Sequence, residues 1–107
     1  MTTERIRDLN DAFRTSFSGG RVMLTVGVDT LPSDVRAMAI REVATFSVFT
    51  GDDDPNGEHD FGAFDLADLK FFWKIDCFDP SLEFGSDDPS DPTKTARVLT
   101  IMLAEEY

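Results

Sequence analysis

The chain has 107 residues, 41% of them hydrophobic, with ten Phe and a single cysteine, Cys77. This composition predicts one globular domain over residues 1–107, and it excludes a disordered chain or a disulfide-stabilised scaffold. The formal net charge of −11 disfavours direct contact with nucleic acid or anionic lipid and favours basic partners. No apolar run approaches the length of a membrane span and the first residues do not resemble a secretion signal, so we expect a cytoplasmic protein without membrane contact.

Residues 3–17 are predicted to form the first helix. Thr2 or Thr3 is the expected N-cap, because a hydroxyl oxygen can accept a hydrogen bond from an unpaired N–H of the first turn. The apolar residues that recur at helical spacing are Ile6, Leu9, Phe13 and Phe17. We expect Gly19 and Gly20 to end the helix, since glycine tolerates the left-handed conformation found at helix C-termini.

A strand over residues 21–28 and a second helix over residues 33–46 are expected next, joined by a connection at 29–32. The residues expected on one face of the strand are Val22, Leu24 and Val26. Ser33 is the expected N-cap of the helix. Its stripe, which includes one polar residue, consists of Val35, Met38, Ala39, Glu42, Val43 and Phe46.

Residues 51–58 are rich in Gly, Pro, Asn and Asp and are predicted to form a loop. A hairpin follows, with strands over 59–66 and 70–78 joined near Ala67-Asp68. The core face of its second strand is expected to hold Phe71, Trp73, Ile75 and Cys77. The opposite, mixed face is expected to hold Phe72, Lys74, Asp76 and Phe78.

Residues 79–95 form a long polar connection with three Pro, and long ordered loops are often functional. Residues 97–103 predict a central strand, with a short buried helix as the alternative. The predicted fold class is therefore α+β, with two helices packed on a mainly antiparallel sheet of about four strands in the order α-β-α-β-β-β.

The unbalanced charge lies in one block, residues 51–92, which holds thirteen Asp or Glu and two Lys. The residues on either side of it carry as many bases as acids. Carboxylates spaced on a rigid scaffold resemble the phosphates of a duplex, and they can occupy the Lys and Arg channel of a nucleic-acid-binding protein. A surface charged only for solubility is the alternative, but confining the charge to one block favours a cationic partner.

The sequence thus predicts a non-enzymatic acidic inhibitor or regulator that occupies the basic surface of a nucleic-acid-binding complex. The expected partner-binding residues are Asp52, Asp53, Asp54, Glu58, Asp60, Asp79, Glu83, Asp87, Asp88 and Asp91. No catalytic residue, metal ligand or cofactor is assigned, and the oligomeric state is left open.

Two alternatives use the segment from Asp52 to Asp60. Its acidic and amide residues at alternate positions match the first half of the calcium loop of EF-hand proteins, which favours a small-ligand or calcium-binding domain. The twelfth position, however, is Ala63 instead of the bidentate Glu, and Pro55 interrupts the loop. The other alternative is a small enzyme that uses His59 with Glu58 or Asp60 as a general base, although no nucleophile motif accompanies it.

Aromatic side chains and the cysteine are interpreted as structural. The run Phe71-Phe72-Trp73 lacks the cationic groove that base-stacking proteins need, so core packing is expected. Phe72 or Phe78 is a candidate interface anchor. Burial and the neighbouring Asp76 disfavour the thiolate of Cys77, which is expected in the core.

Three segments resemble one family: GEHDFGAFDL (57–66), FFWKIDCFDP (71–80) and DPTKTARVLTIMLAEEY (91–107). With residues 6–14 and 19–28, the similarity covers nearly the whole chain. The family is a group of small, functionally uncharacterised bacterial proteins found in chromosomes, plasmids and mobile elements. It implies no activity and no catalytic residue. By analogy, a mobile-element setting suits acidic proteins that block host defence complexes, including anti-CRISPR proteins that imitate nucleic acid and bind a CRISPR effector.

Overall fold

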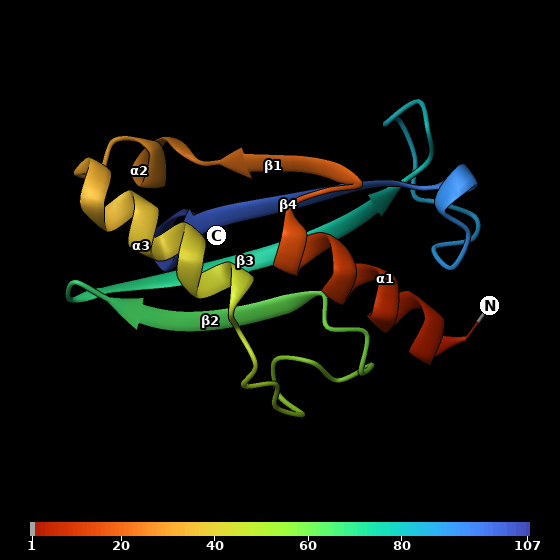
Figure 1. Cartoon of the computed structure of the whole chain (residues 1–107), viewed down its shortest axis with the longest axis horizontal. Coiled ribbons are helices and arrows are strands. Elements are labelled where there is room, and N and C mark those ends of the chain that lie inside the picture. Colours follow the sequence, from red (N-terminus) through yellow and green to blue (C-terminus); the bar gives the residue numbers. More distant parts are fainter. Residues whose placement is uncertain (1) are drawn as a thin grey trace.

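A computed structural model of the chain describes residues 2–107, in which helices pack on one face of a four-stranded sheet (Figure 1). The helices are α1 (Thr3–Ser16), α2 (Val26–Asp29) and α3 (Ser33–Ala44). The strands are β1 (Gly20–Leu24), β2 (Phe61–Leu66), β3 (Leu69–Phe78) and β4 (Ala96–Leu103), and the short 3-10 helices are η1 (Pro92–Lys94) and η2 (Ala104–Glu106). None of the helices described is long and apolar enough to cross a membrane.

The strands are arranged in the order β1-β4-β3-β2. β3 is antiparallel to both β2 and β4, whereas β1 runs parallel to β4. The predicted α+β class and the mainly antiparallel sheet are therefore confirmed. β4 is a central strand, so the alternative of a short buried helix over residues 97–103 was wrong.

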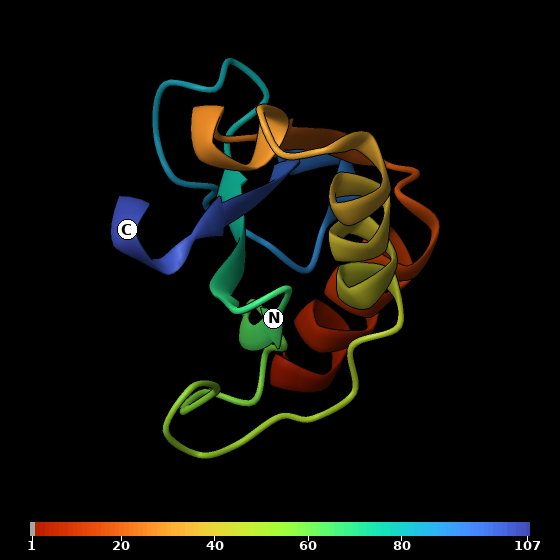
Figure 2. The same ribbon diagram turned by 90° about the vertical axis from the view of Figure 1, so that its left-hand side faces the viewer.

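The core lies between the sheet and the layer formed by α1 and α3, which cover the same face of the sheet (Figure 2). Side chains at alternate positions of β3 and β4 point toward that layer because the side-chain period of a strand is two. The fully buried ones include Phe71, Trp73, Leu99 and Ile101. The predicted core face of the hairpin is confirmed for Phe71, Trp73 and Ile75, and Cys77 is half-buried at its end.

An aromatic cluster covers part of the opposite face of the sheet. The Phe61 and Phe72 rings lie 5.2 Å apart, and Tyr107, which follows η2, packs edge-on against both. Phe72 and Phe78 are both partly buried, so neither projects freely as the predicted interface anchor.

Both long helices differ in detail from the prediction. The residue that adopts the left-handed conformation after α1 is Phe17, with φ of 57°, and its N–H donates to the carbonyl of Phe13. The expected stop at Gly19-Gly20 thus comes two residues earlier. Pro32, not Ser33, is the N-cap of α3, and α3 ends at Ala44, so Phe46 lies outside it.

The predicted strand over residues 21–28 ends at Leu24, because the chain turns there into α2. The Glu106 carboxylate fixes this turn by accepting hydrogen bonds from the Thr25 hydroxyl (2.6 Å) and the Gly27 N–H (2.9 Å). A Cβ on Gly27 would lie 2.6 Å from this carboxylate, so a larger residue here would displace the Glu106 side chain from the turn. Val26 consequently leaves the sheet and is 78% exposed, contrary to the expected shared face.

The hairpin turn is where the sequence indicates it. Ala67 and Asp68 have φ of 54° and 63°, the geometry whose twist suits a two-residue hairpin. β2 begins at Phe61, not at residue 59, because His59 has φ of 53° and still belongs to the preceding loop.

Candidate functional site

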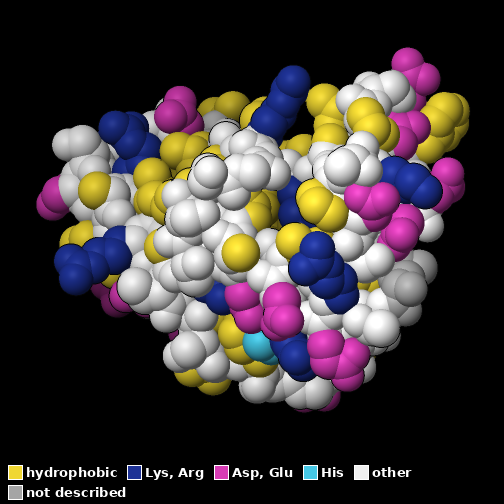
Figure 3. Space-filling view, turned by 45° about the vertical axis from the view of Figure 1, so that its right-hand side comes forward, with side chains coloured by type: hydrophobic (Ala, Val, Ile, Leu, Met, Phe, Trp, Pro, Cys, Tyr) yellow, Lys and Arg dark blue, Asp and Glu magenta, His cyan; other side chains and the backbone are white. Residues whose placement is uncertain are grey.

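The two groups of acidic residues lie on two loops that flank the N-terminal half of α1 (Figure 1). We call residues 51–60 the first acidic loop and residues 79–91 the second acidic loop. Figure 3 shows Asp and Glu side chains gathered on this side of the molecule, with Lys and Arg side chains between them. The acidic surface is thus divided in two.

One buried amide joins both loops to α1. Asn10, 1% exposed, donates from Nδ2 to the carbonyl of Glu58 in the first acidic loop (2.9 Å). Its Oδ1 accepts from Nε of the buried Arg97 (2.8 Å), whose Nη2 also donates to the carbonyl of Pro89 in the second acidic loop. These bonds fix both loops relative to one helix, so their carboxylates stand on a rigid support.

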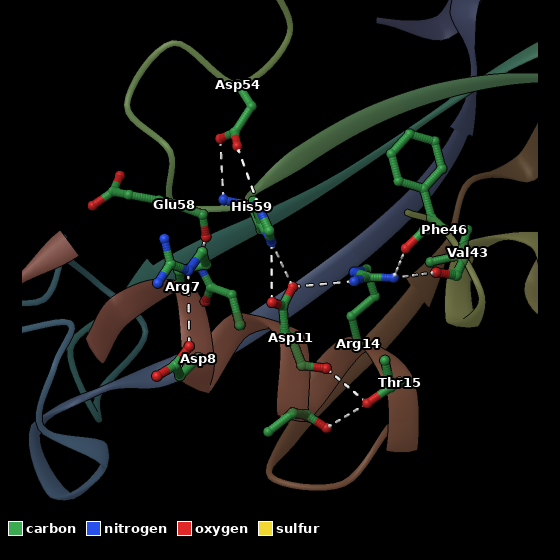
Figure 4. Close-up of polar contacts among 12 residues, drawn as sticks. Arg7, Asp8, Asp11, Arg14, Thr15, Val43, Phe46, Asp54, Glu58 and His59 are labelled. Carbon is green, nitrogen blue, oxygen red and sulfur yellow. Dashed lines mark hydrogen bonds and ion pairs between the residues drawn. The ribbon is translucent and has the colours of Figure 1, made fainter. Parts of the chain in front are cut away.

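His59 fastens the first acidic loop at a second point (Figure 4). Its Nδ1 lies 2.9 and 3.0 Å from the two carboxylate oxygens of Asp11 on α1. Its Nε2 lies 3.7 Å from Oδ2 of Asp54, and its backbone N–H donates to Oδ1 of Asp54 (3.0 Å). The imidazole therefore bridges a helix carboxylate and a loop carboxylate.

Arg14, 3% exposed, continues this network into the core. Its Nη2 donates to Asp11 (3.1 Å), and its Nη1 donates to the carbonyls of Val43 and Phe46 just at and beyond the end of α3. The guanidinium also lies 5.2 Å from the centre of the Trp73 ring. Carbonyl oxygens, one carboxylate and an aromatic face thus surround the buried cation, whose Nε alone has no hydrogen-bond partner among the described residues.

Few carboxylates of residues 51–92 are neutralised by a base. Within residues 2–107, ion pairs reach two of the thirteen: Asp54 with His59, and Asp76 with Lys74 (3.1 Å). The other eleven have no cationic side chain in ion-pair distance. The excess negative charge of residues 51–92 is therefore not compensated by ion pairs in the folded protein.

Two carboxylates of the first acidic loop are held where ionisation is disfavoured. Burial, together with the nearby Asp60 and Asp54, raises the pKa of Glu58. Burial raises the pKa of Asp60, and Asp54 and Asp76 add to this effect, whereas a backbone hydrogen bond and His59 oppose it. Such crowding of like charges indicates a place where an added cation would be stabilised.

In the second acidic loop, by contrast, the surroundings of three carboxylates favour ionisation. The Ser81 hydroxyl and backbone N–H groups lower the pKa of Asp79. Hydrogen bonds from Ser90 lower the pKa of Asp88, and hydrogen bonds from Thr93 lower the pKa of Asp91. These three groups remain ionised below their ordinary range because each accepts hydrogen bonds within the loop.

A hollow of about 380 Å³ lies beside the first acidic loop. It is lined by Asp52, Asp53, Asp60, Phe61, Lys74, Ile75, Asp76 and Tyr107. Carboxylates and aromatic rings meet in this hollow, a combination that suits a guanidinium or ammonium group.

This geometry offers little support for a calcium-binding domain or for an enzyme that uses His59. Among the described residues, no group of three or more His, Cys, Asp or Glu side chains is placed to hold a metal ion. One oxygen of Asp54, in the calcium-like segment, accepts the His59 N–H. His59 is 23% exposed in its side chain, and its ring lies between Asp11 and Asp54, outside the lining of the hollow.

The predicted partner-binding residues differ in how exposed their side chains are. The exposed ones are Asp52, Asp53, Glu83 and Asp87; the partly buried ones are Glu58, Asp60, Asp79, Asp88 and Asp91. Asp54 is only 9% exposed, and its carboxylate organises the loop around His59. Sequence reasoning missed Phe84, which is 69% exposed in the second acidic loop.

A comparison with protein-family models matches residues 24–106 to "Protein of unknown function (DUF3768)". The chain belongs to this family. The DUF3768 match covers the sheet from the end of β1 onward, both acidic loops and η2, and it leaves out α1 with Asn10, Asp11 and Arg14. Neither the curated proteins nor the solved structures that were compared contain a match.

Proposed function

We propose that this chain is a non-enzymatic acidic module that binds a basic protein surface and so inhibits or regulates a nucleic-acid-binding complex. In this proposal the two acidic loops take the place of nucleic-acid phosphates. Blocking a CRISPR effector is one form that such inhibition would take.

The observation that carries the proposal is the unpaired charge. Nine carboxylates of the two acidic loops have no ion-pair partner in the described residues, so a cationic surface would meet them without first breaking internal ion pairs. Unpaired charge of one sign on a small protein also speeds the encounter with a partner of opposite sign.

The anchoring of the loops supports the same proposal. Asn10, Arg97 and His59 hold the two loops on α1 before any partner arrives. Because a fixed loop loses little conformational freedom on binding, more of the electrostatic attraction remains as affinity.

The test reverses charge at the four exposed predicted positions: Asp52→Lys, Asp53→Lys, Glu83→Lys and Asp87→Lys. None of these side chains makes a hydrogen bond or ion pair among the described residues, so folding should survive. Proteins retained from a bacterial lysate by the wild type would be eluted by high salt, and the variant should lose the same proteins. Duplex DNA should compete with the wild type for each captured protein.

A matched control makes the same change in net charge elsewhere. It reverses the exposed acids Asp29, Asp34, Glu42 and Glu105, which lie outside the acidic loops and form no ion pair among the described residues. The control should retain its partners. Equal loss of binding by both variants would mean that net charge alone matters, and retention by the loop variant would refute the proposal.

A further inference from the structure

The start of the second acidic loop is a tight, hydrogen-bonded finger that extends from the end of β3. The Asp79 N–H donates to the carbonyl of Phe84 (2.7 Å), and Phe78 pairs with Gly85 in an antiparallel bridge. Oδ1 of Asp79 accepts from the Ser81 hydroxyl (2.7 Å) and from the Glu83 N–H (3.1 Å). These internal bonds, together with the bridge to β3, hold residues 79–85 in one shape.

This finger exposes an aromatic side chain. All ten Phe lie within the described residues, and Phe84 is the one that is exposed, at 69%, while the other nine are buried or partly buried. Leu82, two residues earlier, is 36% exposed. A lone apolar surface residue is ordinary, but two on one fixed finger make a surface that can bury area against a partner.

The backbone of the finger is strained at the same place. Leu82 has φ of 62°, in the left-handed region that bulky side chains rarely adopt. Glycine or asparagine would satisfy this turn with less strain. Strain that the surrounding hydrogen bonds maintain is characteristic of functional segments.

Acidic residues flank the two apolar residues along the chain. Glu83 and Asp87 are exposed, and neither forms an ion pair among the described residues. Hydrogen bonds within the finger lower the pKa of Asp79, so this carboxylate stays ionised. Figure 3 shows apolar and acidic side chains projecting together at its upper right, where the finger leaves the body.

We propose that Phe84, with Leu82 beside it, is the apolar anchor by which this protein docks on a partner surface that is apolar at its centre and bordered by Lys or Arg. The inference rests on the proposed function and deepens it, because it names what the partner must offer besides positive charge. Carboxylates around the anchor steer the encounter and exclude acidic partners, while burial of the phenyl ring slows dissociation.

The probe is a synthetic amphipathic helical peptide of Lys and Leu, whose leucine stripe is bordered by lysines. A scrambled peptide of the same composition, with no stripe, is the reference. We expect wild-type protein to bind the amphipathic peptide more tightly than the scrambled one in a fluorescence anisotropy titration. Backbone amide signals of residues 79–87 should shift in the NMR spectrum.

Phe84→Ala should weaken binding of the amphipathic peptide by about tenfold and leave the scrambled peptide unaffected. The control Val48→Ala removes another exposed apolar side chain (71% exposed) and should change neither affinity. Unchanged urea midpoints for both variants would show that they fold. The double variant E83Q/D87N should weaken both peptides.

The possible results separate the two proposals. If Phe84→Ala binds both peptides as the wild type does while E83Q/D87N weakens both, the anchor is refuted and the acidic module stands. If Phe84→Ala weakens the binding of both peptides equally, the side chain does not recognise an apolar stripe, and the anchor is again refuted. If the affinity for both peptides is unchanged by salt and by E83Q/D87N, the proposed function itself is refuted.

Discussion

The imidazole ring of His59 lies flat on the phenyl ring of Phe49, with ring centroids 3.6 Å apart and ring planes 2° apart. Phe49 belongs to the segment that leaves α3, and its ring meets Trp73 edge-on at 6.2 Å. The only histidine of the chain is therefore packed against the core on one side while it bonds to carboxylates at its edge. Through these contacts His59 anchors the first acidic loop to the body of the protein.

We expect His59→Ala to lower the free energy of unfolding by about 2 kcal/mol, because it removes an aromatic stack and a hydrogen bond to a carboxylate. Urea denaturation would measure the change. The control Asp53→Asn alters an exposed side chain of the same loop without a bonded partner and should change stability by less than about 0.5 kcal/mol. An unchanged stability for His59→Ala would contradict the assigned role.

Asn10→Ala should cost more, about 2–4 kcal/mol, since it leaves the Glu58 carbonyl and the buried Arg97 without their partner. Hydrogen exchange should quicken in both acidic loops, because both are joined to this one amide. Asp8→Ala, an exposed position of the same helix, is the matched control and should leave exchange in the loops as it is. Faster exchange confined to one loop would show that Asn10 does not couple them.

Gly62→Ala should destabilise the protein by about 1–3 kcal/mol through overpacking. A Cβ at this position of β2 would lie 2.4 Å from Nε1 of Trp73 and 2.8 Å from the Phe46 ring. Gly51 has nothing within 4 Å of the corresponding position, so Gly51→Ala should be tolerated. Thermal unfolding of the two variants would compare them, and equal melting temperatures would count against the close packing of Gly62 on Trp73.

The opposite pKa shifts of the two loops predict opposite dependences of stability on pH. A carboxyl whose pKa is raised by folding contributes stability below its unfolded value of 4.5, and loses it as the pH rises through the folded value. Glu58→Gln should therefore stabilise the protein at neutral pH, with the gain disappearing near pH 4. Urea midpoints measured across this range would show it.

For Asp79 the dependence of stability on pH has the opposite sign. Its lowered pKa gives stability that is present above the unfolded value of 3.8 and is lost as the pH falls through the folded value. Asp79→Asn should thus be less stable than the wild type at neutral pH, and the difference should shrink in acid. The same sign for Asp79→Asn and Glu58→Gln would contradict the assignment of causes to the two loops.

The hairpin and β4 could be predicted from sequence because their alternation has the strand period and the turn lies between two such runs. α2 could not be predicted, because four residues of the pattern VGVD continue a strand equally well. The turn at Thr25 depends on Glu106, which is distant in the sequence and reaches it only in the folded chain. The local secondary-structure propensity of residues 25–29 does not indicate such a long-range contact.

The candidate site was predictable in composition and not in detail. Asp52, Asp53 and Asp54 are adjacent and chemically identical, yet the third is buried and bonded to His59, whose ring is in turn held by Asp11 of α1. Phe84 lies in a polar segment without periodicity, so nothing in the sequence marks it as exposed rather than buried. Exposure is a property of the assembled fold, and the sequence indicates it only where a period exists.

The parallel pairing of β1 with β4 has a consequence for synthesis of the protein. Gly20 pairs with Arg97, so the two strands are more than seventy residues apart in the chain. A ribosome delivers the first strand several seconds before its neighbour, at roughly 5–20 residues per second. During that interval the backbone of the nascent β1 has no neighbouring strand to pair with, and the sheet closes only once the last strand has emerged.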